Sequence, residues 1–119
     1  MGLKKYKWHK VAEGEAEIKW STGGIGVVEL EDGKKICIAR KGDHWYGFAF
    51  NCPHAGGIMA EGWLDEEGNV VCPVHRYKFS LKNGRNTSGE GYHLKRYPVE
   101  SRPDGIFAGI EEGGLFKWF

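Results

Sequence analysis

Closely spaced turn signals constrain the fold of this chain more than any other feature of its sequence. Asp32-Gly33, Gly42-Asp43, Asn83-Gly84 and Asp104-Gly105 each separate two short segments of β-branched and aromatic residues. An Asp-Gly pair is a strong signal for a tight hairpin, because both central positions of that turn favour positive φ. Turns that recur about every 8–12 residues are typical of an all-β antiparallel sandwich or barrel.

The composition agrees with an all-β chain. The 119 residues include 19 glycines and 16 aromatic residues (6 Phe, 5 Trp and 5 Tyr), and the glycine content of about 16% is more than twice the usual ~7%. We therefore expect a single domain over residues 1–119 with about eight to ten short strands. The segments expected to form strands include 26–30, 35–40, 45–50, 77–81, 94–101, 106–110 and 115–119. Residues 58–64 are expected to hold a helical turn.

The charge balance excludes several kinds of partner. With 17 Lys+Arg against 16 Asp+Glu, the formal net charge is +1, which gives no broad electrostatic footprint for nucleic acid or an anionic membrane.

No apolar stretch approaches the ~18 residues of a membrane span. The N-terminus lacks the apolar region of a secretion signal. We expect a soluble cytoplasmic protein in which Lys4–Trp8 begins a solvated strand rather than a nucleic-acid edge.

The cysteines point to a metal site. Three cysteines, Cys37, Cys52 and Cys72, are too few and odd in number for a disulfide framework, which indicates a reducing compartment where Cys and His more often hold a metal. Two of them belong to close pairs, Cys52 with His54 and Cys72 with His75. A structural zinc ion is one reading of two thiolates and two imidazoles, although paired zinc ligands are usually separated by two to four residues.

The spacing of the first pair favours an elongated centre with two metal ions. In an extended loop, Cα atoms two residues apart are separated by roughly 6.6 Å and their side chains lie on the same side, so Cys52 can bind one metal and His54 its neighbour. A [2Fe-2S] cluster is such a centre. Two ferric ions, two sulfides and two thiolates sum to zero charge with neutral imidazoles, which raises the reduction potential relative to four thiolates.

These motifs resemble those of the Rieske iron–sulfur proteins, and most of all the small Rieske-type ferredoxins that supply electrons to aromatic-ring dioxygenases. The resemblance rests on residues 52–57 (CPHAGG) and 72–79 (CPVHRYKF), and it extends through residues 59–64, 79–84 and 94–99. It implies that Cys52 and Cys72 hold the inner iron. It also implies that His54 and His75 hold the outer iron, within an antiparallel β-sandwich that carries a cluster-binding subdomain at about residues 50–82.

Departures from the family pattern narrow the subtype. Gly57 and Val74 occupy the positions of two cysteines that form a disulfide clamp in respiratory-complex Rieske proteins, so that clamp is impossible here. Tyr77 and Phe79 occupy the positions of a Ser and a Tyr hydroxyl that contact the cluster in those proteins. Losing hydrogen bonds to sulfur predicts a potential in the lower part of the Rieske range. The third loop, residues 86–91, has no proline, which leaves the rigidity of the cluster cover open.

The remaining candidates are expected to have structural roles. We interpret His9, His44 and His93 as surface or hydrogen-bonded residues and Cys37 as a small buried hydrophobe. Gly56 and Gly57 are either turn residues or positions where the backbone approaches the cluster closely. Two surface patches are also candidates for contact with a partner. The first is apolar and consists of Gly56, Gly57, Ile58 and Met59. The second is acidic, is either a solvated turn or a docking site for a basic partner, and consists of Glu61, Asp65, Glu66 and Glu67.

The resemblance implies a one-electron carrier that accepts electrons from a reductase and passes them to an oxygenase-type acceptor. Two alternatives stay open: a Rieske-fold small subunit of a larger oxidoreductase such as an assimilatory nitrite reductase, and a zinc-stapled binding module without redox activity. A complete oxygenase is not expected, because Rieske oxygenases need a further domain with a mononuclear iron on two His and a carboxylate. The protein is therefore expected to be an electron-transfer component rather than a whole enzyme.

Overall fold

Strand β3 (Lys35–Lys41) lies at the centre of the fold, since its middle residues are buried on both faces. It belongs to a four-stranded antiparallel sheet of order β2-β3-β4-β8, with β2 at Ile25–Glu29, β4 at His44–Ala49 and β8 at Arg96–Tyr97. Because successive side chains of a strand alternate between faces, β3 supplies two separate clusters of buried residues. This double burial ties the two halves of the molecule to one strand.

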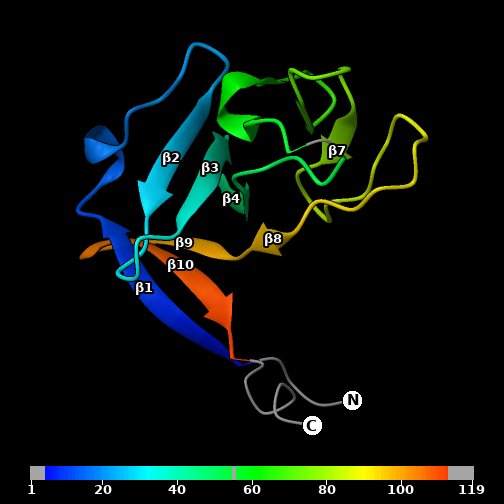
Figure 1. Cartoon of the computed structure of the whole chain (residues 1–119). Coiled ribbons are helices and arrows are strands. Elements are labelled where there is room, and N and C mark those ends of the chain that lie inside the picture. The colour runs from blue at the N-terminus through cyan, green and yellow to red at the C-terminus, as the bar shows by residue number, and fades with distance from the viewer. Residues whose placement is uncertain (1–4, 55, 113–119) are drawn as a thin grey trace, which may run out of the picture.

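The computed structural model describes residues 5–54 and 56–112, and within them all ten strands form three antiparallel sheets (Figure 1). The all-β prediction is confirmed, and these sheets do not close into a barrel. Two short 3-10 helices, Glu15–Glu17 and Met59–Glu61, interrupt the strands, and the second confirms the helical turn expected within residues 58–64. The strand expected at 115–119 lies outside the described residues. No helix in the described ranges is long and apolar enough to cross a membrane.

One face of β3 packs against a three-stranded sheet of order β1-β10-β9, formed by Tyr6–Ala12, Gly105–Glu111 and Val99–Arg102. Ile36 and Ile38 are fully buried there, in a cluster that includes Ile106 and Ala108. β1 runs antiparallel to β10 with Tyr6 opposite Glu111. This half of the molecule is the sandwich that the turn spacing predicts.

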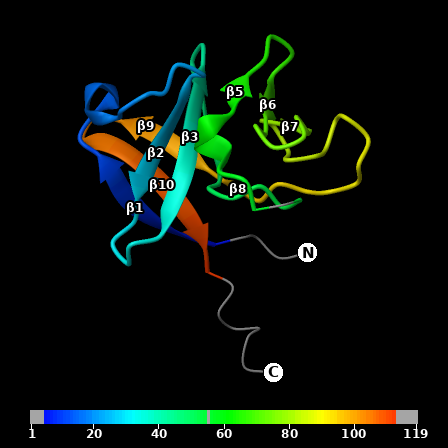
Figure 2. The ribbon, with the colours of Figure 1, turned by 45° about the horizontal axis from the view of Figure 1, so that its top comes forward.

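The other face of β3 supports a third sheet, β5-β6-β7, made of Trp63–Leu64, Asn69–Val71 and Lys78–Ser80. Cys37 and Ala39 are fully buried on this side, in a cluster that also contains Cys52 and Cys72. Burial raises the pKa of the Cys37 thiol to about 12, so the prediction that Cys37 is a buried apolar residue is confirmed. Figure 2 shows this small sheet at the end of the molecule away from β1 and β10.

The hairpin between β2 and β3 differs from the two-residue turn that Asp32-Gly33 predicts. Gly33 N–H donates to Leu30 O at 2.9 Å, and Leu30 N–H donates to Lys34 O at 2.8 Å, so the loop has three residues. Within it only Gly33 has positive φ, +89°. Three-residue hairpin loops of this kind need a single left-handed residue, which glycine adopts without strain.

The double burial of β3 makes its isoleucines the side chains on which stability depends most. Ile38→Ala should lower the free energy of unfolding by about 2–5 kcal/mol, because it removes a fully buried side chain from a packed core. Val27→Ala, on the neighbouring strand, should cost less, since Val27 is only half-buried. Urea unfolding followed by tryptophan fluorescence measures both changes. Equal losses for the two variants would contradict the central role of β3.

Candidate metal centre

The two Cys/His motifs form loops with the same closure. Cys52 N–H donates to Gly57 O at 2.7 Å, and Cys72 N–H donates to Tyr77 O at 2.9 Å. In each loop the cysteine therefore bonds the carbonyl five residues ahead (57 − 52 and 77 − 72). The first loop connects β4 to the Met59–Glu61 turn, and the second connects β6 to β7. The chain thus forms two similar loops, each with one thiol and one imidazole.

The thiols form the buried half of the site. Cys52 is 3% exposed and Cys72 is fully buried, and both belong to the same buried cluster. Burial raises the pKa of the Cys72 thiol to about 11; the Val74 N–H bond opposes this rise and the Cys52 thiol adds to it. Two adjacent buried thiols lose their protons only when a cation stabilises the thiolates. The two thiols are therefore better placed to bind a metal than to react as free thiols with molecules in solvent.

The imidazoles form the outer half. The rings of His54 and His75 lie 5.0 Å apart between centroids, tilted by 49°. His75 is exposed and His54 half-buried. The Nδ1 atom of His54 is buried without a hydrogen-bond partner in the described structure. An unpaired buried nitrogen is costly, and a metal bond would satisfy it.

The four side chains are arranged as two pairs rather than around one point. Within the described residues, no group of three or more His, Cys, Asp or Glu side chains is placed to hold a single ion. The inner pair is sulfur and the outer pair is nitrogen. Donors of this chemistry in this arrangement fit a [2Fe-2S] cluster with two thiolates on one iron and two imidazoles on the other.

The second loop contains strained backbone at His75 and Arg76. Their φ angles are +63° and +61°, and they are the only non-glycine residues with positive φ in the described ranges. Left-handed conformations cost about 1–3 kcal/mol for such residues and persist where the surroundings enforce them. Two in succession reverse the chain at His75 and Arg76, which brings Tyr77 O back to Cys72 N–H.

Gly57 and Gly56 resolve the two readings left open by the sequence. A Cβ atom on Gly57 would lie 2.7 Å from Val74 Cγ2 and 3.3 Å from Cys72 Sγ, so the two loops touch at this residue. Gly56 has φ +71° and nothing within 4 Å of a Cβ, which identifies it as a turn residue. Gly57 is needed for close approach and Gly56 for backbone conformation.

Two tyrosines enclose the His54 ring. Tyr77 stacks on it with centroids 4.2 Å apart and an interplanar angle of 28°, and Tyr92 lies 5.2 Å away. Partial burial, followed by the charge of Glu90, raises the pKa of Tyr77, so its hydroxyl is protonated at neutral pH. From the sequence, Tyr77 was identified only as the residue at the position of a cluster-contacting Ser in respiratory-complex Rieske proteins, and Tyr92 was missed. The one signal for Tyr92 was an aromatic residue directly after a run of small polar residues.

The loop over residues 86–91 is held by Asn86 rather than by proline. The Asn86 Oδ1 atom accepts the N–H groups of Glu90 and Gly91, and its Nδ2 donates to Lys78 O at 2.9 Å and to Glu90 Oε1 at 3.0 Å. Lys78 N–H donates to Ser88 Oγ at 2.9 Å. The Asn86 side chain therefore fixes the loop of residues 86–91 against β7 without the help of a proline.

One surface prediction needs correction. Met59 is fully buried and cannot belong to the expected apolar contact patch, whereas Ile58 is partly exposed.

The contacts of Asp65 agree with the solvated-turn reading of the acidic residues. Asp65 is half-buried, and its carboxylate accepts the backbone N–H groups of Glu67 and Asn69. Partial burial opposes the change, but the hydrogen bonds from the Asn69 side chain and from these backbone groups lower the pKa of Asp65. Asp65 therefore shapes the β5–β6 turn.

The other histidines lie apart from the centre. His9 Nδ1 is 3.3 Å from Glu31 Oε1, His44 is exposed at the start of β4, and His93 is exposed beside Arg85. These positions agree with the surface and hydrogen-bonded roles expected of them.

Comparison with known proteins agrees with the geometry. Residues 7–98 match the family model of the Rieske [2Fe-2S] domain. The chain is 28% identical over 86 residues to the 3-phenylpropionate/cinnamic acid dioxygenase ferredoxin subunit of Escherichia coli (strain K12), covering 71% of this chain and 81% of that subunit.

Two solved structures share the fold. The first is a complex of reduced oxygenase and oxidized ferredoxin in carbazole 1,9a-dioxygenase (TM-score 0.70, 24% identity, 85% of this chain and 91% of that chain). The second is assigned as the small subunit of an NADH-dependent nitrite reductase from Mycobacterium tuberculosis (TM-score 0.70, 19% identity, 92% and 97%).

The role of Asn86 predicts a specific change in loop protection. Asn86→Ala should expose the Glu90 and Gly91 amides to hydrogen exchange, because both lose their acceptor. Asn83→Ala is the matched control: it removes only the acceptor of Arg85 N–H and should leave residues 90–91 protected. Unchanged exchange at Glu90 and Gly91 in the Asn86 variant would contradict this account.

Acid should weaken the same loop. Hydrogen bonds from Ser88 and then Asn86 lower the pKa of Glu90, so their stabilisation is present above the ordinary carboxyl pKa and is lost as pH falls through the lowered value. The protection of the Glu90 amide, taken relative to its intrinsic exchange rate at each pH across the acid range, measures this loss. The variant Glu90→Gln should remove most of the pH dependence.

Proposed function

Because its residues 7–98 match the Rieske [2Fe-2S] domain, the chain belongs to this family, and from that premise we propose that it is a one-electron carrier between a reductase and an oxygenase-type acceptor. The observation that carries the proposal is the split site, with two buried thiols behind two imidazoles at the surface. Family membership implies one Rieske [2Fe-2S] cluster, which supplies reversible one-electron transfer when bound. A zinc-stapled module does not agree with that membership.

We assign the cluster ligands to Cys52, His54, Cys72 and His75. The two thiols buried in one cluster and the unpartnered buried Nδ1 of His54 support this assignment. The Val74 N–H bond to Cys72 would stabilise negative charge on that sulfur. We also propose that residues of about 50–82 act as the cluster-binding subdomain.

The surroundings shield the two cysteines from solvent and leave the two histidines accessible. Burial of both cysteines keeps water from the inner ligands. Exposed His75 and half-buried His54 leave the outer ligands within reach of a partner. Transient redox partners bury small interfaces, so an imidazole edge beside the exposed Tyr92 suffices as the contact.

The partner assignment rests on what the relatives are named for. One is the ferredoxin subunit of a dioxygenase, and another is solved in complex with an oxygenase. We propose the same kind of acceptor here, with an electron-transfer component rather than a complete enzyme. We place it in the cytoplasm, because its three cysteines are free and buried and free thiols persist in reducing compartments.

A second candidate is the small subunit of a larger oxidoreductase, favoured by the shared fold with the nitrite reductase subunit. Presence of all four candidate ligands favours the free carrier. Size exclusion of a native lysate separates the two: a carrier elutes near 13.4 kDa, or as a small oligomer, and a subunit co-elutes with a large enzyme.

The ligand assignment predicts the effect of replacing an outer imidazole by a thiolate. His75→Cys should lower the reduction potential, because the added negative charge disfavours the reduced state. His44→Cys makes the same change outside the loops and should leave the potential unaltered. Protein-film voltammetry measures both, and an unchanged potential in the His75 variant would refute the assignment.

Electron delivery tests the function directly. The reduced protein is mixed anaerobically with the oxidised oxygenase component of a 3-phenylpropionate dioxygenase, and reoxidation is followed in the visible range. We expect reoxidation to reach completion within seconds and to depend on oxygenase concentration. Reoxidation no faster than in buffer would contradict an oxygenase-type acceptor.

A further inference from the structure

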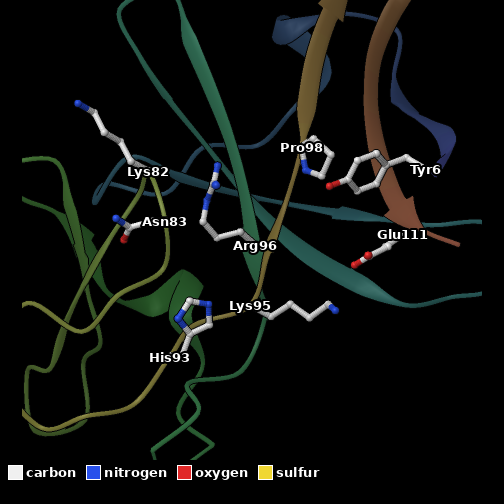
Figure 3. Close-up of a pocket in the computed structure, with 8 residues that line it drawn as sticks. All are labelled: Tyr6, Lys82, Asn83, His93, Lys95, Arg96, Pro98 and Glu111. Carbon is white, nitrogen blue, oxygen red and sulfur yellow. The ribbon is translucent and has the colours of Figure 1, made fainter. Parts of the chain in front are cut away.

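A pocket lies where β1 and β10, strand β8 and the turn after β7 come together. The pocket has a volume of about 560 Å³, which is within the range of small-molecule sites. Tyr6 and Glu111 come from paired positions of β1 and β10, Arg96 comes from β8, and Asn83 comes from the turn after β7. Figure 3 shows Arg96 in the middle, with Asn83 on one side and Tyr6 and Glu111 on the other.

The lining is rich in cations. Lys82, Lys95 and Arg96 contribute three positive charges against one negative charge from Glu111, which gives +2 in a protein whose net charge is only +1. Within the described residues, none of these three cations forms an ion pair. A concave site of one charge sign raises the local concentration of the opposite ion.

Arg96 is fixed in place and has spare donor capacity. Its guanidinium carbon lies 5.9 Å from the centroid of the Tyr46 ring. Its stem passes over Gly84, where a Cβ would lie 3.3 Å from Arg96 Cγ. The Nε atom is buried and has no partner among the described residues. Burial lowers the pKa of Arg96, as expected for a cation whose charge is not compensated nearby.

We propose that this pocket binds a multivalent oxyanion of the phosphate class, either free or as the diphosphate of a nucleotide. An arginine fork matches phosphate oxygens in a bidentate manner. The flexible stems of Lys82 and Lys95 allow their ammonium groups to close on the ligand, and the Asn83 amide and the Tyr6 hydroxyl add neutral donors. None of the four candidate cluster ligands lines this pocket, so the proposal stands or falls independently of electron transfer.

Calorimetric titration of the cluster-loaded protein with sodium pyrophosphate tests the proposal. We expect saturable binding to one site. Arg96→Gln should weaken it by about tenfold or more, as for loss of a hydrogen bond between charged groups. Lys82→Gln, on an exposed turn where folding is not at risk, should weaken it severalfold. Lys19→Gln makes the same charge change at an exposed position outside the pocket and should have no effect.

Three results would overturn the proposal. They are absence of saturable pyrophosphate binding, equal affinity in wild type and both pocket variants, and a Lys19→Gln effect as large as that of Lys82→Gln. The last would mean that overall charge alone attracts the anion. Titration with ADP identifies the source: equal affinities indicate a free oxyanion, and tighter binding of ADP indicates a nucleotide. Binding of adenosine as tight as that of ADP would contradict recognition of phosphate.

Discussion

The structure depends on burying two thiols side by side while two imidazoles stay near the surface. Cys52 and Cys72 are almost completely shielded from solvent, and such a pair can be ionised only beside a compensating cation. His54 and His75 lie above them with their rings 5.0 Å apart. The loop closures and the tyrosine contacts at this end of the molecule hold the two thiols inside and the two imidazoles nearer the surface.

The fold meets this requirement by giving β3 two buried faces. Ile36 and Ile38 pack the strand against the β1-β10-β9 sheet, and Cys37 and Ala39 join the core that contains Cys52 and Cys72. The loops are therefore mounted on a packed core rather than on a flexible surface. Backbone strain at His75 and Arg76 is tolerated because the surrounding contacts outweigh it.

The sequence predicted the features that depend on local chemistry. Most of the strands and turns, the buried Cys37 and the two Cys/His loops follow from turn residues, alternation and donor types, whereas the short strands β5 and β6 were not predicted. Features that depend on long-range contacts were not predictable. Met59 is apolar and lies two residues after a glycine pair, yet tertiary packing buries it. Asn86 replaces proline as the anchor of its loop through bonds to Lys78 and Glu90, and Tyr92 reaches His54 across more than thirty residues (92 − 54 = 38).

The visible absorption spectrum of the freshly purified protein, with iron, sulfide and zinc assayed on the same sample, tests the central claim most directly. The account predicts a red-brown chromophore that bleaches with dithionite, at two irons and two sulfides per chain. A colourless protein with one zinc ion and no sulfide would contradict it. The four ligands would then hold a structural ion, and electron transfer would have to be abandoned.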